Sequence, residues 1–136
     1  MNPYQVDAAL FAIKSALSNG ALLADEIGLG KTIEAGLVLA QYWSERKRRI
    51  LLIVPASLRM QWRSELSEKF YIDFVIMEFT NFNKERKAGK FNPFEVSNQV
   101  VICSYDFASR KAIEIRNVQW NRVIMDETHK LCNIYL

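Results

Sequence analysis

The stretch ALLADEIGLGKTIEAGLVLA, residues 21–40, decides how the fold of this chain is interpreted. A short apolar run comes first, a segment with two glycines follows, and a helical pattern ends the stretch. A strand, a glycine-rich turn and a helix in this order form a phosphate-binding loop, because backbone N–H groups and the helix dipole then face an anion. The usual pattern G-x-x-x-x-G-K-[ST] has a glycine where this sequence has Asp25, whereas GLGKT at residues 28–32 is complete.

The residues of this loop predict particular contacts with a nucleotide. Gly28 and Gly30 let the backbone curl around a phosphate group. Lys31 would place its ammonium on the β and γ phosphates, and the Thr32 hydroxyl would bind Mg²⁺. The alternative is an incidental glycine turn with a surface lysine. G-x-G-K-T placed between a strand and a helix is too specific to favour that alternative.

A second motif, VIMDETHK at residues 123–130, supplies the acidic groups that such a loop needs. The predicted strand ends in Asp126, whose carboxylate can hold Mg²⁺, and Glu127 can orient and deprotonate an attacking water. An acidic pair after a strand is often only a solvated strand end, but the phosphate loop upstream favours the catalytic interpretation. His129 is either an ordinary turn histidine or a sensor of the phosphate site, and one histidine makes no metal site.

The rest of the chain alternates between apolar runs and helical patterns. We predict strands at residues 21–24, 50–54, 74–79, 99–105 and 122–127, helices at 3–18 and 31–46, a helix capped by Ser57, a short helix from about 106, and a loop at 81–97. Unbroken apolar strands that alternate with helices predict a parallel α/β sheet. Ligands of such sheets bind at the carboxyl ends of the strands, where both motifs are found.

Composition limits the class of protein further. The 136 residues are half hydrophobic, which suffices for one core, and the net charge is only +3. We expect neither a membrane-spanning helix nor a secretory leader, and Cys103 and Cys132 are interpreted as reduced core thiols of an intracellular protein. Basic residues cluster at 45–49, 84–90 and 109–111, where they are either solvated loop charges, the commoner case, or phosphate contacts.

Five segments together resemble a known family. They read PYQVDAALFAI, GALLADEIGLGKTIEAGLVLAQ, ILLIVPASLRMQWRSEL, VVICSYDF and VIMDETHKL. They are similar to the glutamine motif and to motifs I, Ia, Ib and II of the SWI/SNF-type DNA-dependent ATPases of helicase-like superfamily two. The resemblance extends from residue 2 to about residue 133 and is strongest to the bacterial branch that includes the RNA-polymerase-recycling ATPase. The first glycine of the loop is also absent in this family.

The resemblance implies a three-layer RecA-like P-loop NTPase lobe that uses ATP and Mg²⁺. Gln5 would read the adenine edge, and Lys31, Asp126 and Glu127 would be the catalytic residues. Thr32 and Asp126 would hold the metal, and His129 would couple the site to the rest of the protein. The nucleotide-binding loop would comprise Asp25, Glu26, Ile27, Gly28, Leu29, Gly30, Lys31 and Thr32.

Contacts with the DNA backbone are implied for residues of motifs Ia and Ib. They are Pro55, Ser57, Gln61, Ser104 and Tyr105. Trp62 fits a stripe with Leu66 and Phe70 on one helix face, which favours a core position over a DNA contact. For Tyr105 both interpretations stay open.

Family members also carry motif III and a second RecA-like lobe, so we expect residues 1–136 to be a partial first lobe that ends after the motif II strand. The resemblance places the motif III strand between the strands of motifs I and II. Its absence would leave backbone groups of both strands unpaired, at about 1–3 kcal/mol for each buried group. We therefore expect marginal stability and little or no ATP hydrolysis by the chain alone.

The function expected from the resemblance is ATP-driven translocation along double-stranded DNA that remodels bound proteins. Expected partners are the DNA phosphate backbone, the second lobe, and RNA polymerase or another DNA-bound protein, in the cytoplasm or on a bacterial nucleoid. Two alternatives stay open. One is a strand-separating or restriction-type helicase, and the other is an inert lobe that binds nucleotide without hydrolysing it.

Overall fold

The computed structural model describes residues 24–27, 32–96 and 98–126. Strands and helices alternate along this part of the chain. In order, they are β1 (Ala24–Ile27), α2 (Thr32–Ser44), β2 (Ile50–Val54), the 3₁₀ turn η1 (Ala56–Leu58), α3 (Arg59–Phe70), β3 (Phe74–Ile76), α4 (Phe79–Lys87), β4 (Val100–Ser104), α5 (Tyr105–Arg110), α6 (Ala112–Arg116) and β5 (Arg122–Asp126). The predicted first helix lies outside the described residues.

The five strands form one sheet in the order β1-β5-β2-β4-β3, and every neighbouring pair is parallel. The predicted parallel α/β fold is thus confirmed. The central strands β2 and β4 are buried along their whole length and are apolar apart from Ser104, as expected of strands covered on both faces. None of the helices in the described part of the chain has the length and hydrophobicity that a membrane crossing needs.

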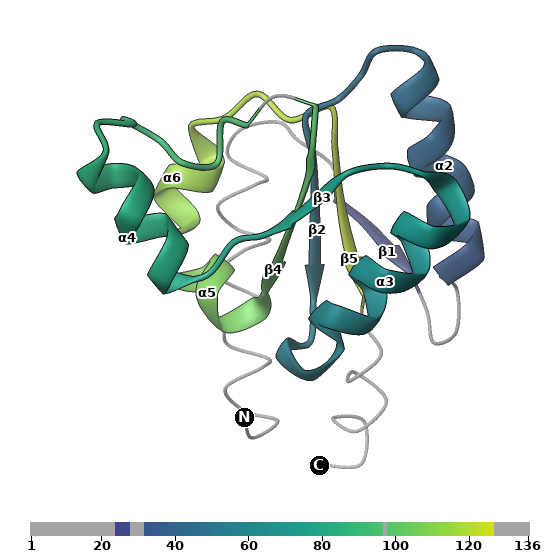
Figure 1. Ribbon diagram of the computed structural model, residues 1–136, viewed down its shortest axis with the longest axis horizontal. Helices are drawn as coiled ribbons and strands as arrows, with labels where there is room; N and C mark the ends of the chain where they lie inside the picture. The colour runs from purple at the N-terminus through teal and green to yellow at the C-terminus, as the bar shows by residue number, and fades with distance from the viewer. Residues whose placement is uncertain (1–23, 28–31, 97, 127–136) are drawn as a thin grey trace.

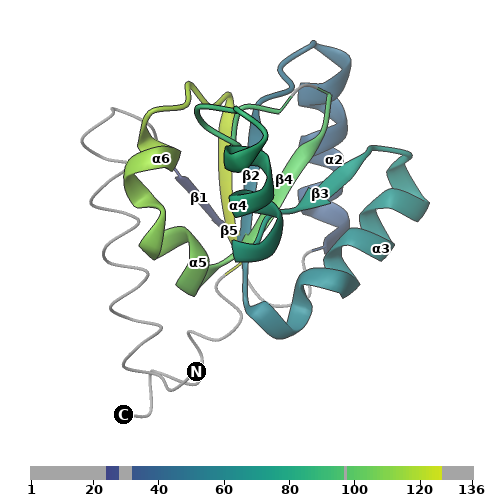
Figure 2. The ribbon, with the colours of Figure 1, turned by 60° about the vertical axis from the view of Figure 1, so that its left-hand side comes forward.

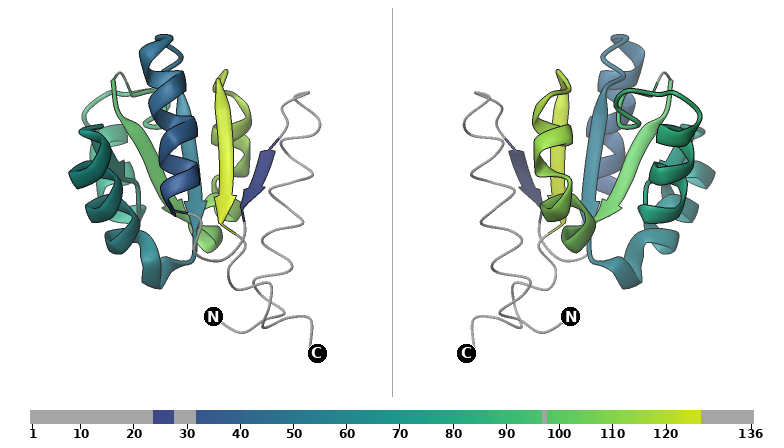
Figure 3. Two further views of the ribbon diagram at one scale, coloured as in Figure 1. Left: turned by 90° about the vertical axis from the view of Figure 1, so that its right-hand side faces the viewer. Right: turned by 90° about the vertical axis from the view of Figure 1, so that its left-hand side faces the viewer.

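Helices cover both faces of the sheet and make a three-layer domain. Figure 1 shows α2 and α3 on one side of the strands and α4, α5 and α6 on the other, and Figure 3 shows the same layers from two opposite directions. Figure 2 turns the second side toward the viewer, so that α4, α5 and α6 lie in front of the sheet. Because side chains alternate along a strand, each face has its own core. Leu52, Trp62 and Leu66 belong to the first core, and Ile53 and Phe107 to the second.

The first strand begins later than predicted. We predicted it at residues 21–24, whereas β1 spans Ala24–Ile27 and residues 21–23 lie outside the described part. The backbone of residues 25–27, which we had assigned to the nucleotide loop, therefore pairs with β5. Ladder hydrogen bonds are made by backbone groups, so the polar side-chain types at these positions do not prevent pairing.

The position of β1 in the sheet also corrects an expectation. The resemblance placed another strand between the strands of motifs I and II, but β1 pairs directly with β5, from Ala24 opposite Val123 to Ile27 opposite Asp126. This pairing satisfies the backbone groups that we expected to be left without partners. Among the described residues, this pairing removes the cause from which we expected a loss of stability.

The predicted loop at residues 81–97 was wrong over its first half, because α4 occupies Phe79–Lys87. A capping box begins this helix: the Glu78 side chain accepts from the backbone N–H of Asn81, while the Glu78 N–H donates to the Asn81 side chain at 2.7 Å. Phe82 is completely buried. Basic side chains occupy the last turn, where they interact favourably with the negative end of the helix dipole. One buried residue in nine gives no visible periodicity, which explains the error.

The segment between β2 and α3 does not contain the helix cap that we predicted. Ser57 was predicted to cap the helix, but it lies inside η1, and α3 starts at Arg59 without a side-chain cap. The left-handed residue Tyr71 ends α3 and donates its N–H to the Ser67 carbonyl. The predicted stripe is confirmed, since Trp62 and Leu66 are buried and Phe70 packs against the same core.

Candidate active site

Both sequence motifs reach the same edge of the sheet. Because all strands are parallel, their carboxyl ends lie together, and this edge contains Asp126 at the end of β5 and Ile27 at the end of β1. These two residues are register partners. The glycine loop, residues 28–31, lies outside the described part, but its flanking residue Ile27 is thus directly beside Asp126.

The Asp126 carboxylate is buried and held from one face of the sheet. Only 2% of the residue is exposed, and the indole Nε1–H of Trp62 donates to its Oδ2 at 2.9 Å. Trp62 is one turn into α3 and belongs to the core between this helix and the sheet. A hydrogen bond to a buried carboxylate is charge-assisted, so it fixes the orientation of the group strongly.

The backbone of Asp126 is held from the other face. The Tyr105 hydroxyl donates to the Asp126 carbonyl oxygen, and the tyrosine ring is buried in the core under α5. Ser104 is also buried, and its Oγ accepts the Phe107 N–H at 3.1 Å as the N-cap of α5. Both hydroxyls are engaged inside the domain, and the contact of Ser104 and Tyr105 with DNA stays a prediction.

The remaining motif Ia residues are more accessible. Pro55 is half-buried, while Ser57 and Gln61 are exposed, and the Gln61 amide donates to Glu65 one turn along α3 at 3.3 Å. Their contact with DNA stays a prediction. The predicted core position of Trp62 is confirmed, because only 5% of it is exposed.

Sequence reasoning missed Arg59 beside these residues. Its guanidinium donates to the Ala56 carbonyl and forms an ion pair of 3.0 Å with Glu78. It borders a cavity of about 540 Å³ that runs along β3, and a second cavity of about 450 Å³ beyond the carboxyl ends of β3 and β4. The signal in the sequence is the position of this arginine, which directly follows the 3₁₀ turn after a parallel strand.

The Asp126 carboxylate suits a metal ion that is bound together with a phosphate compound. In the described ranges there is no group of three His, Cys, Asp or Glu side chains that could hold an ion. Mg²⁺ is commonly held by one or two carboxylates together with phosphates and water, so a single buried aspartate fits that donor set. Strand β4, which is separated from β5 by β2, carries Cys103. Complete burial raises the pKa of this thiol and keeps it inert, as predicted for a core cysteine.

Several predicted site residues lie outside the described part of the chain. They are Gln5, Gly28, Leu29, Gly30, Lys31, Glu127 and His129. Asp25, Glu26 and Ile27 are placed in β1 by their backbone, and Thr32 begins α2. The structure therefore places the strand before the glycine loop, the helix after it, and Asp126 opposite Ile27 at the end of that strand.

The hydrogen bond between Trp62 and Asp126 was not foreseen, although the sequence contains a signal for it. A buried indole N–H needs an acceptor. A tryptophan on the helix stripe after one parallel strand is close to the carboxyl end of the adjacent strand. Register and helix orientation decide which acceptor it meets, and only the folded structure contains them.

Known proteins resemble this chain over most of its length. Residues 4–135 match the SNF2-related domain family. Over 114 residues the chain is 41% identical to the RNA polymerase-associated protein RapA of Serratia proteamaculans (strain 568), and the alignment covers 81% of this chain. It spans 12% of the length of that RapA protein.

Proposed function

This chain belongs to the SNF2-related domain family, and we propose that it forms the ATP-binding part of the first RecA-like lobe of a double-stranded-DNA-dependent ATPase. The observation that carries the proposal is the buried carboxylate of Asp126, fixed by Trp62 and located beside the strand that leads into the glycine loop. A phosphate loop and an acidic strand end meet at this edge in nucleotide-hydrolysing α/β domains.

Each group has a defined task in this proposal. Gly28 and Gly30 would supply backbone N–H groups to the phosphates, and Lys31 would add a positive charge. Thr32 and Asp126 would hold Mg²⁺, which neutralises charge on the phosphates when it is bound. Gln5 would select adenine.

Hydrolysis in this proposal depends on Glu127, which directly follows the fixed aspartate. Its carboxylate would orient a water molecule toward the γ phosphate and accept its proton. Trp62 and Tyr105 support the reaction as positioning residues, since they fix the side chain and the backbone of Asp126 from opposite faces of the sheet. His129 would sense the phosphates and couple the site to the rest of the protein.

The same contacts connect the nucleotide to the segment proposed to bind DNA. Trp62 lies on α3 next to Gln61, so a movement of this helix would move the donor that holds Asp126. Pro55, Ser57 and Gln61 would meet the phosphate backbone of duplex DNA. Binding should therefore weaken steeply with salt and depend little on base sequence.

The complete protein would couple hydrolysis to movement along DNA and displace bound proteins. A second lobe would complete the site, and RNA polymerase in the cytoplasm is a candidate target. This part of the proposal is based on the relative whose name states its association with RNA polymerase.

Hydrolysis of ATP by the complete protein that carries this domain, with and without duplex DNA, tests the proposal. The Glu127→Gln variant should bind ATP as wild type does but hydrolyse it at least about 100-fold more slowly, because it lacks the general base. If wild type and Glu127→Gln hydrolyse ATP at the same rate, both with and without duplex DNA, the proposed ATPase is rejected. The lobe would then only bind nucleotide. Strand separation by wild type would instead indicate a helicase.

A further inference from the structure

Another polar cavity lies at the edge of the sheet where the strands begin, opposite the candidate active site. Its volume is about 580 Å³, and it is lined by Arg46, Arg48, Arg49, Val96, Asn98, Gln119 and Asn121. The three arginines precede β2, Asn98 precedes β4, and Asn121 precedes β5. The candidate active site is at the carboxyl ends of these strands, so the two sites are separated by the length of the sheet.

Arg48 is held in place within this cavity. Its guanidinium donates to Asn98 Oδ1 at 3.0 Å, and the Nε–H donates to the Trp43 carbonyl at 3.4 Å. The guanidinium carbon Cζ lies over the Trp43 ring, 4.9 Å from the ring centroid. Arginine loses much side-chain entropy when it binds an anion, and a guanidinium that is already ordered loses less. Arg48 therefore has the character of a preorganised binding residue.

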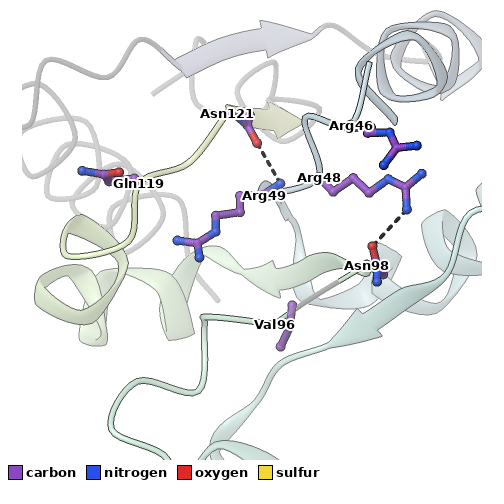
Figure 4. Close-up of a pocket in the computed structure, with 7 residues that line it drawn as sticks. All are labelled: Arg46, Arg48, Arg49, Val96, Asn98, Gln119 and Asn121. Atoms are coloured by element: carbon purple, nitrogen blue, oxygen red, sulfur yellow. Dashed lines mark hydrogen bonds between the residues drawn. The ribbon is translucent and has the colours of Figure 1, made fainter. Parts of the chain in front are cut away.

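The cavity wall is also fixed through its backbone. The N–H of Arg49 donates to Asn121 Oδ1 at 3.0 Å, and the N–H of Asn121 donates to the Arg49 carbonyl at 2.7 Å. Figure 4 shows that the Arg48 and Arg49 side chains leave this anchored segment in opposite directions, with Arg48 reaching Asn98. The pair thus covers two sides of the cavity.

The charge of the lining is positive. It contains three guanidinium groups and no carboxylate among the described residues. A carboxylate outside the lining, that of Glu95, pairs with Arg49 at 3.3 Å, and both side chains are about half exposed, so water screens this pair. The remaining lining groups include three amide side chains, which can donate to oxygen atoms. This combination suits an oxygen-rich anion.

We propose that this cavity is a binding site for phosphate groups, with Arg48 as its central residue and Arg46 and Arg49 beside it. Guanidinium groups match tetrahedral phosphate oxygens through paired N–H donors. The volume of the cavity is in the range of small-ligand sites and is much larger than one phosphate requires. The phosphate can belong to a nucleic-acid backbone or to a free phosphate compound. The site is independent of the proposed ATPase site.

The test measures binding to the whole chain with two probes, inorganic pyrophosphate and a fluorescent duplex DNA of about two helical turns. NMR signals of the arginine Nε–H groups report which guanidinium is contacted. Arg48→Ala should weaken binding of the relevant probe about 10-fold or more, because a charge-assisted pair of hydrogen bonds is lost. Arg48→Lys should keep only part of the wild-type affinity, because lysine keeps the charge but not the paired N–H donors.

Arg46→Asn is a second variant that does not disturb the contacts of Arg48. Arg46 has a positive φ of 63°, which asparagine tolerates, so the fold should persist while one charge is removed. Lys84→Ala is the control for charge alone, because Lys84 is exposed on α4, outside the cavity. Thermal unfolding verifies that each variant is folded.

Loss of duplex binding in both arginine variants, with competition by pyrophosphate, would assign the site to nucleic acid. Loss of pyrophosphate binding alone would assign it to a free phosphate compound. The proposal is overturned if both variants bind both probes as Lys84→Ala does, or if polyglutamate displaces the probes better than pyrophosphate, which would indicate an acidic peptide. Lys31→Ala should leave binding in this cavity unchanged.

Discussion

Asp126 is fixed from two sides by residues of two different cores. The Trp62 indole holds its carboxylate, and the Tyr105 hydroxyl holds its carbonyl oxygen. Burial of polar groups is costly unless they have hydrogen-bond partners. The Trp62 donor offsets that cost for the carboxylate, and the Tyr105 donor does so for the backbone carbonyl. In the proposed ATPase site, this arrangement would hold the acidic group in a fixed orientation for Mg²⁺, as a precise metal site requires.

At this scale we predict the effect of Trp62→Phe. The change keeps an aromatic ring but removes the donor to Asp126, so the free energy of unfolding should fall by about 1–3 kcal/mol. The affinity for Mg²⁺–ATP should fall as well, while the affinity for ATP without Mg²⁺ stays close to that of wild type. Urea unfolding and nucleotide titrations at several Mg²⁺ concentrations measure the two effects.

Trp120→Phe is the matched control for this prediction. The Trp120 indole is also buried and donates to the Ile115 carbonyl at 2.8 Å, but it lies in the core on the opposite face of the sheet. The Trp120→Phe protein should be less stable than wild type, but the dependence of its ATP affinity on Mg²⁺ should not change. If both variants alter Mg²⁺ dependence alike, or if Trp62→Phe leaves it unchanged, Trp62 has only a packing role.

At the scale of elements, α2 and α3 approach each other closely at Gly36. A glycine inside a helix is ordinarily a weak point of that helix. A Cβ atom at this position would be 2.0 Å from Cε2 of Phe70, the last residue of α3. The glycine therefore permits the contact between the two helices that cover one face of the sheet.

We predict that Gly36→Ala destabilises the domain, contrary to the usual gain from replacing a glycine inside a helix. The Phe70 ring must move out of the core, so the free energy of unfolding should decrease by about 1–3 kcal/mol. Urea unfolding followed by circular dichroism measures it. Phe70→Leu added to Gly36→Ala should recover part of the loss. A more stable Gly36→Ala protein would refute the close contact.

On the scale of the whole molecule, the parallel sheet separates two kinds of site. Its carboxyl edge gathers the end of β1, Asp126 and the starts of η1 and α5, whereas its amino edge gathers the arginine cavity. Parallel strands all point the same way, so residues that follow strands meet at one edge and residues that precede them meet at the other.

Nucleotide binding should stabilise the whole domain. We predict that Mg²⁺–ATP at 100 times its Kd raises the free energy of unfolding by about 2.7 kcal/mol, because it binds only the folded chain. Thermal unfolding with and without the ligand measures this. Lys31→Ala should lose the stabilisation, and Lys84→Ala on α4 should keep it. A shift that persists in Lys31→Ala would mean that the nucleotide binds elsewhere.

Local sequence patterns were sufficient for most of the fold. Unbroken apolar runs such as residues 50–54 predicted buried parallel strands, and the spacing of Trp62, Leu66 and Phe70 predicted the buried face of α3. Patterns failed where few residues carry the signal. The helix α4 has one fully buried side chain, and its cap consists of Glu78 and Asn81, whose polar character alone resembled a loop.

The parallel α/β architecture, the family and the acidic residue at the end of β5 could all be predicted from the residues alone, because each depends on local periodicity or on contiguous motifs. The folded chain was needed to show that β1 pairs with β5, that Trp62 and Tyr105 hold Asp126, and that three arginines share a cavity with Asn98. These features join residues distant in the chain. Their partners are selected by strand register and helix packing, and neither is encoded in any single segment.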